Sequence, residues 1–335
     1  MKRHANLSVF VPHAGCTHRC SFCDQHTIAG TVKMPTPEEV AALCEAQLPA
    51  PGEGEHCEIA FFGGSFTALD EEVMCGLLAA AAPFVEQRRA AGIRLSTRPD
   101  AIDPAKLALL HRYHVTAVEL GAQSMSDKVL ALNERGHTSL QVRFAARLIK
   151  NAGFSLGLQM MVGLYGETDP VRSARDTALA LAALEPDTVR IYPALVLPGT
   201  GLARLYAAGA YKPLTVEAAV EAVAPLLELF EAKGIRVIRV GLHDEPGLAE
   251  KVLAGPYHPA FRQLCDGALY LKECRRLLAA KPAGRYILYT APGQRSAAAG
   301  QKNQNLAQLA AEGWQLTVCE TQDLSGRAVC IAAEN

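Results

Sequence analysis

The amino-acid sequence predicts an α/β protein, a partial (β/α)6-type TIM barrel with a small C-terminal α+β appendage. Short apolar segments alternate with longer helical patterns through residue 240. The apolar segments are nearly continuous, which is typical of parallel strands that are covered on both faces. Repeated β-then-α units imply right-handed crossovers, and six or seven such units favour a barrel, complete or partial, over an open sheet.

The expected strands are spaced along the first two thirds of the chain. They are 7–13, 57–62, 93–97, 115–121, 154–162, 188–193 and, as a candidate seventh strand, 235–240. Helix start signals lie between them. Thr36, Pro37 and Glu39 form a capping box with proline at the first helical position. Asp103 and Thr138 are expected to cap the starts of two further helices.

The sequence pattern divides the chain into two parts. Residues 1–240 are expected to form the barrel domain, and 241–335 to form a loop-rich connection and a small β-α-β-β appendage. Around 241–284 the pattern changes to loops and short helices with several Gly and Pro residues. The appendage elements are expected at 285–290, near 301–312, at 314–320 and at 327–333.

Composition restricts the class of protein. The chain has 335 residues, half of them hydrophobic, and its net charge is −1. Such a balance gives no overall attraction to nucleic acid or anionic membranes, so a nucleic-acid site would need a local basic patch. The apolar stretches are too short to span a membrane, and the N-terminal segment is too short and polar for a secretion signal. We expect a soluble, cytoplasmic protein that does not bind membranes.

Three of the ten cysteines are closely spaced. Cys16, Cys20 and Cys23 form a C-x3-C-x2-C motif directly after the first expected strand. In a β/α barrel that position lies at the mouth where active sites are built. Iron–sulfur clusters are held by cysteine thiolates, and a cubane normally takes four. Three ligands would therefore leave one iron open for a ligand from outside the chain.

Two other interpretations of the cysteine motif remain open from spacing alone. A zinc ion would need a fourth ligand, which His13, His18 or His26 could supply. The spacing can also arise by chance. The other seven cysteines are scattered and show no short ligand spacing, so we expect most of them to be small buried apolar residues rather than ligands of a second cluster.

The motif, with the aromatic Phe22 before its last cysteine, resembles the radical S-adenosylmethionine (SAM) superfamily. The resemblance implies that Cys16, Cys20 and Cys23 ligate a [4Fe–4S] cluster, with Phe22 beside the cofactor. The fourth iron would bind the amino and carboxylate groups of SAM. One electron from a reductant such as ferredoxin or flavodoxin would then cleave SAM to methionine and a 5′-deoxyadenosyl radical. In such enzymes the protein orients the cofactor and excludes water.

Two further strand ends resemble SAM-binding positions of this superfamily. Gly63, Gly64 and Ser65 follow the second strand, where a Gly-Gly motif brings backbone groups close to the methionyl end of SAM. An ordinary turn is the alternative interpretation. Ser96 ends the third strand at a position that holds the SAM ribose and is usually Glu in relatives. The shorter, neutral serine implies a weaker ribose contact, or one that another residue supplies.

The fourth and fifth strands add more candidates. Gln123 and Arg135 match the SAM-contacting Gln and Arg of relatives in type and spacing. Gln159 ends the fifth strand at a position that is Asp in oxygen-independent coproporphyrinogen III oxidase, so it is expected near the adenosine. Glu119 and Arg190 lie on the fourth and sixth strands. Each is open to two roles, in the cavity chemistry or in an ion pair within the barrel.

Residues 6–240, with the segments GGSFT, TRPD and ELGAQS, resemble the radical SAM part of the Elongator catalytic subunit. More distantly they resemble the coproporphyrinogen oxidase. The first resemblance implies an enzyme that modifies a tRNA base. The expected appendage lacks an evident acetyl-CoA loop, so the chain resembles Elongator-like proteins without the acetyltransferase domain.

Two alternatives remain for the function. The first alternative is a radical SAM enzyme that acts on a small anaerobic metabolite such as a tetrapyrrole, in keeping with the more distant resemblance. A structural or regulatory cluster protein is a third class. That class is disfavoured because the chain has candidate SAM-contacting residues at the strand ends in addition to the cysteine motif.

Overall fold

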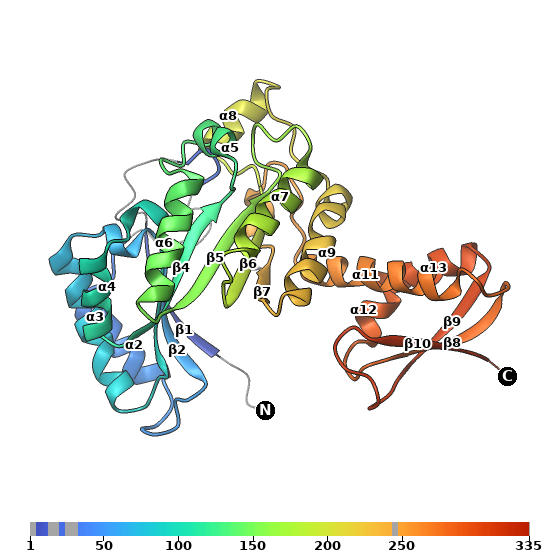
Figure 1. Cartoon of the computed structure of the whole chain (residues 1–335), viewed down its shortest axis with the longest axis horizontal. Helices are drawn as coiled ribbons and strands as arrows, with labels where there is room; N and C mark the ends of the chain where they lie inside the picture. The colour runs from blue at the N-terminus through green and yellow to red at the C-terminus, as the bar shows by residue number, and fades with distance from the viewer. Residues whose placement is uncertain (1–4, 13–19, 24–32, 243–246, 335) are drawn as a thin grey trace.

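The computed structural model describes residues 5–12, 20–23, 33–242 and 247–334. Its first unit is a sheet of seven parallel strands whose spatial order follows the sequence (Figure 1). The strands are β1 (Ala5–Val11), β2 (Cys57–Gly63), β3 (Gly92–Thr97), β4 (Val115–Gln123), β5 (Ser155–Val162), β6 (Thr188–Pro193) and β7 (Arg236–Val240). β1 and β7 are the two edges of this sheet. The sheet is therefore a partial barrel, as predicted, with the candidate seventh strand present.

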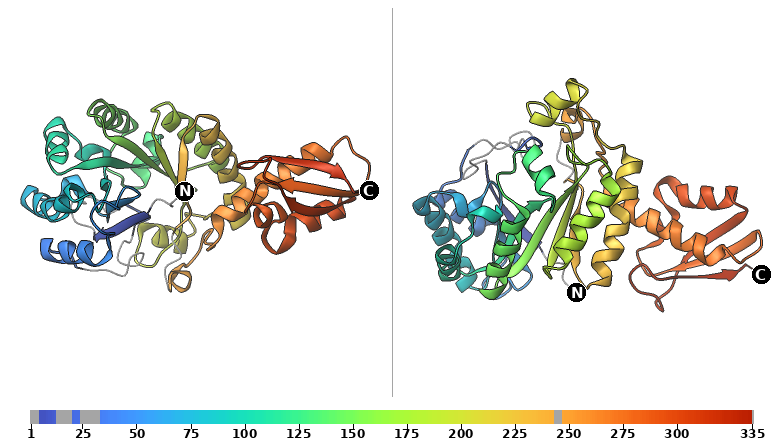
Figure 2. Two further views of the ribbon diagram at one scale, coloured as in Figure 1. Left: turned by 90° about the horizontal axis from the view of Figure 1, so that it is seen from below. Right: turned by 45° about the horizontal axis from the view of Figure 1, so that its top comes forward.

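Helices cover the outer, convex face of the sheet, as the view along the barrel in Figure 2 shows. They are α2 (Pro37–Gln47), α3 (Glu71–Glu86), α4 (Pro104–Arg112), α6 (Ser139–Asn151), α7 (Pro170–Ala182) and α9 (Val216–Ala232). The shorter α5 (Asp127–Leu132) and α8 (Gly201–Ala207) lie at the mouth of the barrel. The three predicted caps are confirmed: Thr36, Asp103 and Thr138 each accept a hydrogen bond from the first turn of their helix.

The apolar core lies between the outer face of the sheet and the helices. Val9, Ile59, Leu95, Val118 and Leu158 point outward from successive strands and are almost completely buried there. The inner face is different, because its side chains are mostly polar or charged and line a cavity. We expected both faces of the sheet to be covered by other parts of the protein, and this is wrong for the inner face. A partial barrel leaves space inside, and polar side chains keep that space wettable.

The C-terminal unit is a three-stranded sheet with helices on one face. It comprises α11 (Phe261–Leu278), β8 (Gly284–Thr290), α12 (Arg295–Ala299), a 3-10 turn (Gln301–Asn303), α13 (Gln304–Ala311), β9 (Trp314–Glu320) and β10 (Val329–Ala333). β8 lies in the centre, parallel to β9 and antiparallel to β10. The predicted appendage is present, with its helical part divided between α12 and α13. The one-turn α10 (Leu248–Lys251) precedes it.

The prediction of loops and short helices over 241–284 is wrong in its second half, where the 18-residue α11 lies. The first half of this helix packs in the barrel core and the second half in the appendage core. The residues are Phe261, Cys265 and Leu269 in the former, and Tyr270, Cys274 and Leu278 in the latter. Gly267 lowers helix propensity in the middle, but packing against two cores overrides that preference. The barrel core thus continues beyond residue 240.

Within the described residues, no helix is both long and apolar enough to cross a membrane.

Candidate active site

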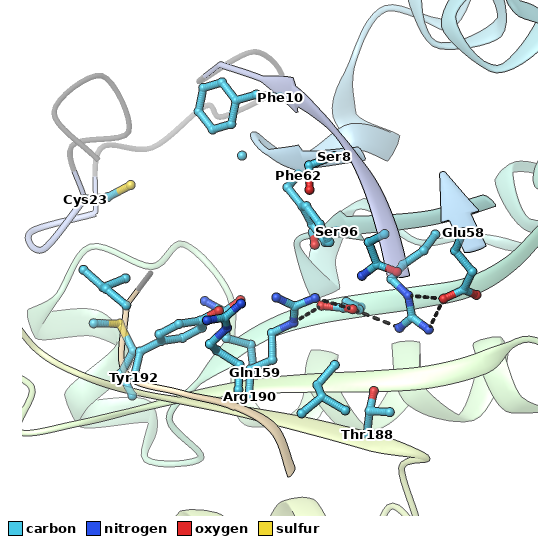
Figure 3. A pocket seen from close by; sticks show the side chains of 18 of the residues that line it. Ser8, Phe10, Cys23, Glu58, Phe62, Ser96, Gln159, Thr188, Arg190 and Tyr192 are labelled. Carbon is cyan, nitrogen blue, oxygen red and sulfur yellow. Dashed lines mark hydrogen bonds and ion pairs between the residues drawn. The ribbon is translucent and has the colours of Figure 1, made fainter. Parts of the chain in front are cut away.

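A cavity of about 980 Å³ lies inside the barrel. Every strand of the seven-stranded sheet contributes side chains to its wall, and the segment 20–23 closes part of one end (Figure 3). Many of the lining groups are hydroxyls, amides or charged groups. A cavity of this size and polarity holds a drug-sized ligand and gives it many hydrogen-bonding partners.

Four charged side chains form a continuous ion-pair network across the cavity wall. Arg94 Nη2 lies 2.7 Å from Glu58 Oε2, and Arg94 Nη1 lies 2.9 Å from Glu119 Oε1. The second oxygen of Glu119 lies 2.7 Å from Arg190 Nε. Figure 3 shows this chain of contacts as dashed lines. The network joins β2, β3, β4 and β6, and its two acids balance its two bases.

The glycine on the intervening strand permits this network. Gly157 on β5 pairs with Glu119 on one side and with Thr188 on the other. A Cβ at Gly157 would lie 2.6 Å from Cγ of Glu119, too close for any side chain. The glutamate side chain therefore crosses β5 over the bare glycine and reaches Arg190 on β6.

Arg190 stays charged inside the cavity. Its burial lowers the guanidinium pKa, but Glu119 and Tyr192 together raise this pKa by more, and the net shift is upward. The guanidinium also lies over the ring of Phe62, 4.8 Å from the centroid, which is a favourable cation–π distance. Arg190 and Tyr192 both line the cavity, as expected for alternate residues of one strand. The ion-pair role left open for Glu119 and Arg190 is the one that the structure shows.

Two of the three motif cysteines lie in the described residues. Cys23 lines the cavity, and Figure 3 shows its side chain at the end where Phe10 also lies. Cys20 is partly buried, and its Sγ accepts a hydrogen bond of 3.1 Å from Arg135 Nη1. Cys16 lies outside the described residues. The two described thiols thus lie at the mouth of the barrel, one facing the cavity and one facing a cation.

A buried asparagine fixes the segment that carries these cysteines. Asn133 accepts a 2.7 Å hydrogen bond at its side-chain oxygen from Ser21 Oγ, and its backbone oxygen accepts one from Ser21 N. Its amide nitrogen donates to the carbonyl oxygens of Val129 and Tyr165. Leu202 at the start of α8 donates from its backbone to Ser21 O. The segment is therefore held from two sides.

The structure brings four of the predicted cofactor-binding residues to the cavity wall. They are Phe22, Gly63, Ser96 and Gln159. Gly63 has a φ of +108°, and a Cβ there would lie 2.5 Å from Val11 O. Gly64 donates from its backbone to the same oxygen. The Gly-Gly pair thus joins the ends of β1 and β2 and leaves open backbone beside the cavity.

The other predicted cofactor-binding residues in the described part of the chain do not line the cavity. Gly64 and Ser65 follow β2 directly, and Ser65 is buried. Gln123 is buried with a φ of +64°, and its Oε1 has no hydrogen-bond partner among the described residues. A left-handed non-glycine residue stores strain, and an unpaired buried oxygen is costly. Both are features of functional sites. Arg135 meets Cys20 and the carbonyl of Gly121.

Sequence reasoning missed Glu58, Arg94 and Asn133. For the first two a signal existed, since charged residues at alternate positions of strand segments point to a polar inner face. Asn133 gave no signal of its own, because its partners Ser21 and Tyr165 are distant in sequence.

His137, beside this site, makes the stability of the fold depend on pH. Burial, and then repulsion by the Arg135 guanidinium, lower the pKa of His137 to about 4. The unfolded chain binds this proton near the ordinary value of 6.5, so stability is complete above that pH and falls as the pH drops toward 4. We expect a loss of about 2 kcal/mol at pH 5. Urea unfolding of the wild type and of His137→Gln, each at pH 5 and at a pH above 6.5, measures this loss of stability. An equal loss in the two proteins would show that His137 is not its source.

Among the described residues, no group of three or more His, Cys, Asp or Glu side chains is placed to hold a metal ion. The histidines considered as zinc ligands, His13, His18 and His26, lie outside those residues.

An open parallel β/α barrel with a cysteine motif at its mouth and a polar cavity beneath defines a class of enzymes that act through a bound cofactor. The model of the radical SAM superfamily matches residues 10–177, half of the chain, and that of the radical SAM C-terminal domain matches 186–270. The chain therefore belongs to the radical SAM superfamily.

Similar proteins of known sequence or structure were also found. The tRNA uridine(34) acetyltransferase of Dehalococcoides mccartyi is 28% identical over 245 residues, 62% of this chain and 52% of that protein. Elongator complex protein 3 of Danio rerio is 36% identical over 143 residues, 41% of this chain and 25% of that protein. The chain thus spans about half the length, or less, of these relatives. The archaeal Elp3 of Methanocaldococcus infernus, solved with an N-terminal deletion, has the same fold, with a TM-score of 0.64 and 21% identity over 82% of this chain and 64% of that one.

The protein is thus an enzyme whose cofactors are a [4Fe–4S] cluster and SAM. The described residues fit these groups. Cys20 has a cationic partner suited to a thiolate, Gly63 brings backbone without a side chain to the cavity wall, and Gln123 has an unpaired buried oxygen among the described residues.

Proposed function

We propose that this enzyme cleaves SAM reductively and modifies a base of tRNA. The observation that carries the tRNA assignment is the match over 245 residues to a tRNA uridine(34) acetyltransferase. Shorter matches to further tRNA uridine(34) acetyltransferases and to Elongator complex protein 3 support it. The cavity adds a physical argument, since about 980 Å³ with a polar wall suits the adenosine of SAM together with a nucleobase.

The cofactors would be held by residues at the strand ends. Cys16, Cys20 and Cys23 would bind the cluster, and Phe22 would lie beside it. The backbone around Gly63 would meet the methionyl end of SAM. When bound, the cluster and SAM supply one-electron cleavage of SAM to methionine and a 5′-deoxyadenosyl radical.

Further residues would orient the adenosyl half of SAM. Ser96 on β3 and Gln159 on β5 line the cavity on either side of β4, and their hydroxyl and amide groups suit a ribose and an adenine. Gln123 would use its unpaired oxygen, and Ser65 would complete the loop after β2. Arg135 would act at the mouth of the barrel, beside the cysteines. Enclosure by the strands would keep water from the reactive carbon.

The reaction needs one electron from outside the chain, and we infer that a ferredoxin or flavodoxin supplies it. Such donors and tRNA meet in the cytoplasm, where we place the enzyme.

The test uses tRNA from cells in which the gene is deleted. Reconstituted protein with SAM and dithionite is expected to release more 5′-deoxyadenosine with this tRNA than without it, and to create a nucleoside of new mass in nuclease digests. Binding should weaken as salt rises, because phosphate contacts release counterions. Cys20→Ala serves as the inactive control. Unchanged release together with an unchanged nucleoside profile would refute tRNA as the substrate.

One observation favours a second candidate, a small anionic metabolite such as a carboxylated tetrapyrrole. Arg236 and Arg239 on the edge strand β7 line the cavity in addition to the balanced network. The lining therefore carries more basic than acidic groups, and arginine suits carboxylates. Accumulation of an acidic metabolite in the deletion strain, with normal tRNA, would favour this candidate.

A further inference from the structure

Arg135 lies at hydrogen-bonding distance from a cysteine of the motif. It is buried in the loop between α5 and α6, and its Nη1 lies 3.1 Å from Cys20 Sγ. Its Nη2 donates to Gly121 O at 2.5 Å, and the guanidinium carbon lies 5.9 Å from the ring centroid of Phe22. Three contacts therefore hold the guanidinium in one orientation against the sulfur.

No carboxylate among the described residues balances the charge of this arginine. None of the ion pairs among the described residues includes Arg135, whereas the equally buried Arg94 meets two glutamates. The Nε of Arg135 is also buried without a hydrogen-bond partner in the described part of the chain. A buried cation without a counter-charge is costly. The sulfur of Cys20, as an iron-bound thiolate, would supply that counter-charge.

Hydrogen bonds between neighbouring residues keep Arg135 and Cys20 together. Asn133 lies two residues before Arg135 and is hydrogen-bonded to Ser21, the residue after Cys20. Asn133 is completely buried and its amide is anchored to two carbonyl oxygens. The arginine and the cysteine are thus carried by two segments that are themselves bonded together, so their separation is fixed by the fold.

We propose that Arg135 is a positioning residue that raises the reduction potential of the cluster through Cys20. Reduction adds one electron, supplied by the external reductant, and places more negative charge on the cluster and its sulfur ligands. A fixed cation and an N–H···S hydrogen bond stabilise the reduced state more than the oxidised one. No bond at Arg135 forms or breaks and no proton moves. The inference rests on the proposed assignment of Cys20 as a cluster ligand.

The experiment measures the cluster potential in the full-length protein, reconstituted under anaerobic conditions without SAM. Titration with dithionite and electron paramagnetic resonance gives the midpoint. Arg135→Gln removes the charge, and we expect the ratio of reduced to oxidised cluster at a given potential to fall about tenfold, which is about 59 mV for one electron. Arg89→Gln is the matched control, because Arg89 is also buried but pairs with Glu45. Its potential should equal that of the wild type.

Arg135→Lys keeps the charge but not the planar pair of donors, so it should lower the potential by less. If Arg135→Gln does not fold, Arg135→Lys tests the proposal in its place. A potential of Arg135→Lys at or above the wild-type value would then overturn the proposal. A wild-type potential in Arg135→Gln overturns it as well. So does a shift that appears only after SAM is added, since Arg135 would then act on SAM. Wild type that binds no cluster refutes the proposed function itself.

Discussion

Cys20→Ala is expected to abolish binding of the iron–sulfur cluster. Three thiolates are the proposed protein ligands, and the two that remain would leave two irons without a protein ligand. Arg135 would also lose the sulfur that it contacts at 3.1 Å. After anaerobic reconstitution, iron and sulfide analysis should give four irons in the wild type and close to none in the variant, and the brown absorbance should disappear.

Cys319→Ala is the matched control for this experiment. Cys319 is also partly buried, but it lies on β9 of the appendage, away from the barrel. This variant should retain the full iron content. Retention of a full cluster by Cys20→Ala would show that Cys20 is not a ligand.

Glu119→Ala is expected to lower the free energy of unfolding by about 3 kcal/mol, the cost of breaking a buried ion pair from one side. The Glu119 side chain is 4% exposed and meets both Arg94 and Arg190. Its removal leaves Arg190 without the carboxylate that raises its pKa, and leaves Arg94 with Glu58 alone. Urea unfolding of the cluster-free protein at pH 7.5 measures the change.

Glu185→Ala provides the comparison. Glu185 pairs with Lys150, but its side chain is 83% exposed, and surface ion pairs contribute about 0–1 kcal/mol. A similar small loss in Glu119→Ala would mean that water in the cavity already solvates the two arginines. The loss of unfolding free energy in Glu119→Gln should lie between the losses in Glu185→Ala and Glu119→Ala, because glutamine keeps hydrogen-bonding atoms but loses the charge.

The sequence predicted best those features that neighbouring residues determine. Strand segments, the caps at Thr36, Asp103 and Thr138, and the appendage strands follow from local patterns, and the structure shows them near the expected bounds. The cysteine motif is equally local, since its members lie within eight residues of one another. Family membership could therefore be recognised from a short segment.

Contacts between distant residues could not be predicted in the same way. Glu58 and Arg94 are 36 positions apart, and Glu119 and Arg190 are 71 apart. Their pairing depends on strand register, on the curvature that turns one face inward, and on the missing side chain of Gly157. The position of Arg135 beside Cys20 likewise depends on tertiary structure, although its residue type matched a predicted cofactor contact.

The most direct test of the proposed chemistry is the release of 5′-deoxyadenosine. Reconstituted protein is incubated with SAM and dithionite without oxygen, and the products are separated by liquid chromatography and identified by mass. We predict that the wild type releases 5′-deoxyadenosine over repeated time points while Cys20→Ala releases only background. Equal release by the two proteins, from samples in which the wild type carries its full iron content, would contradict the assignment of this motif as the site of SAM cleavage.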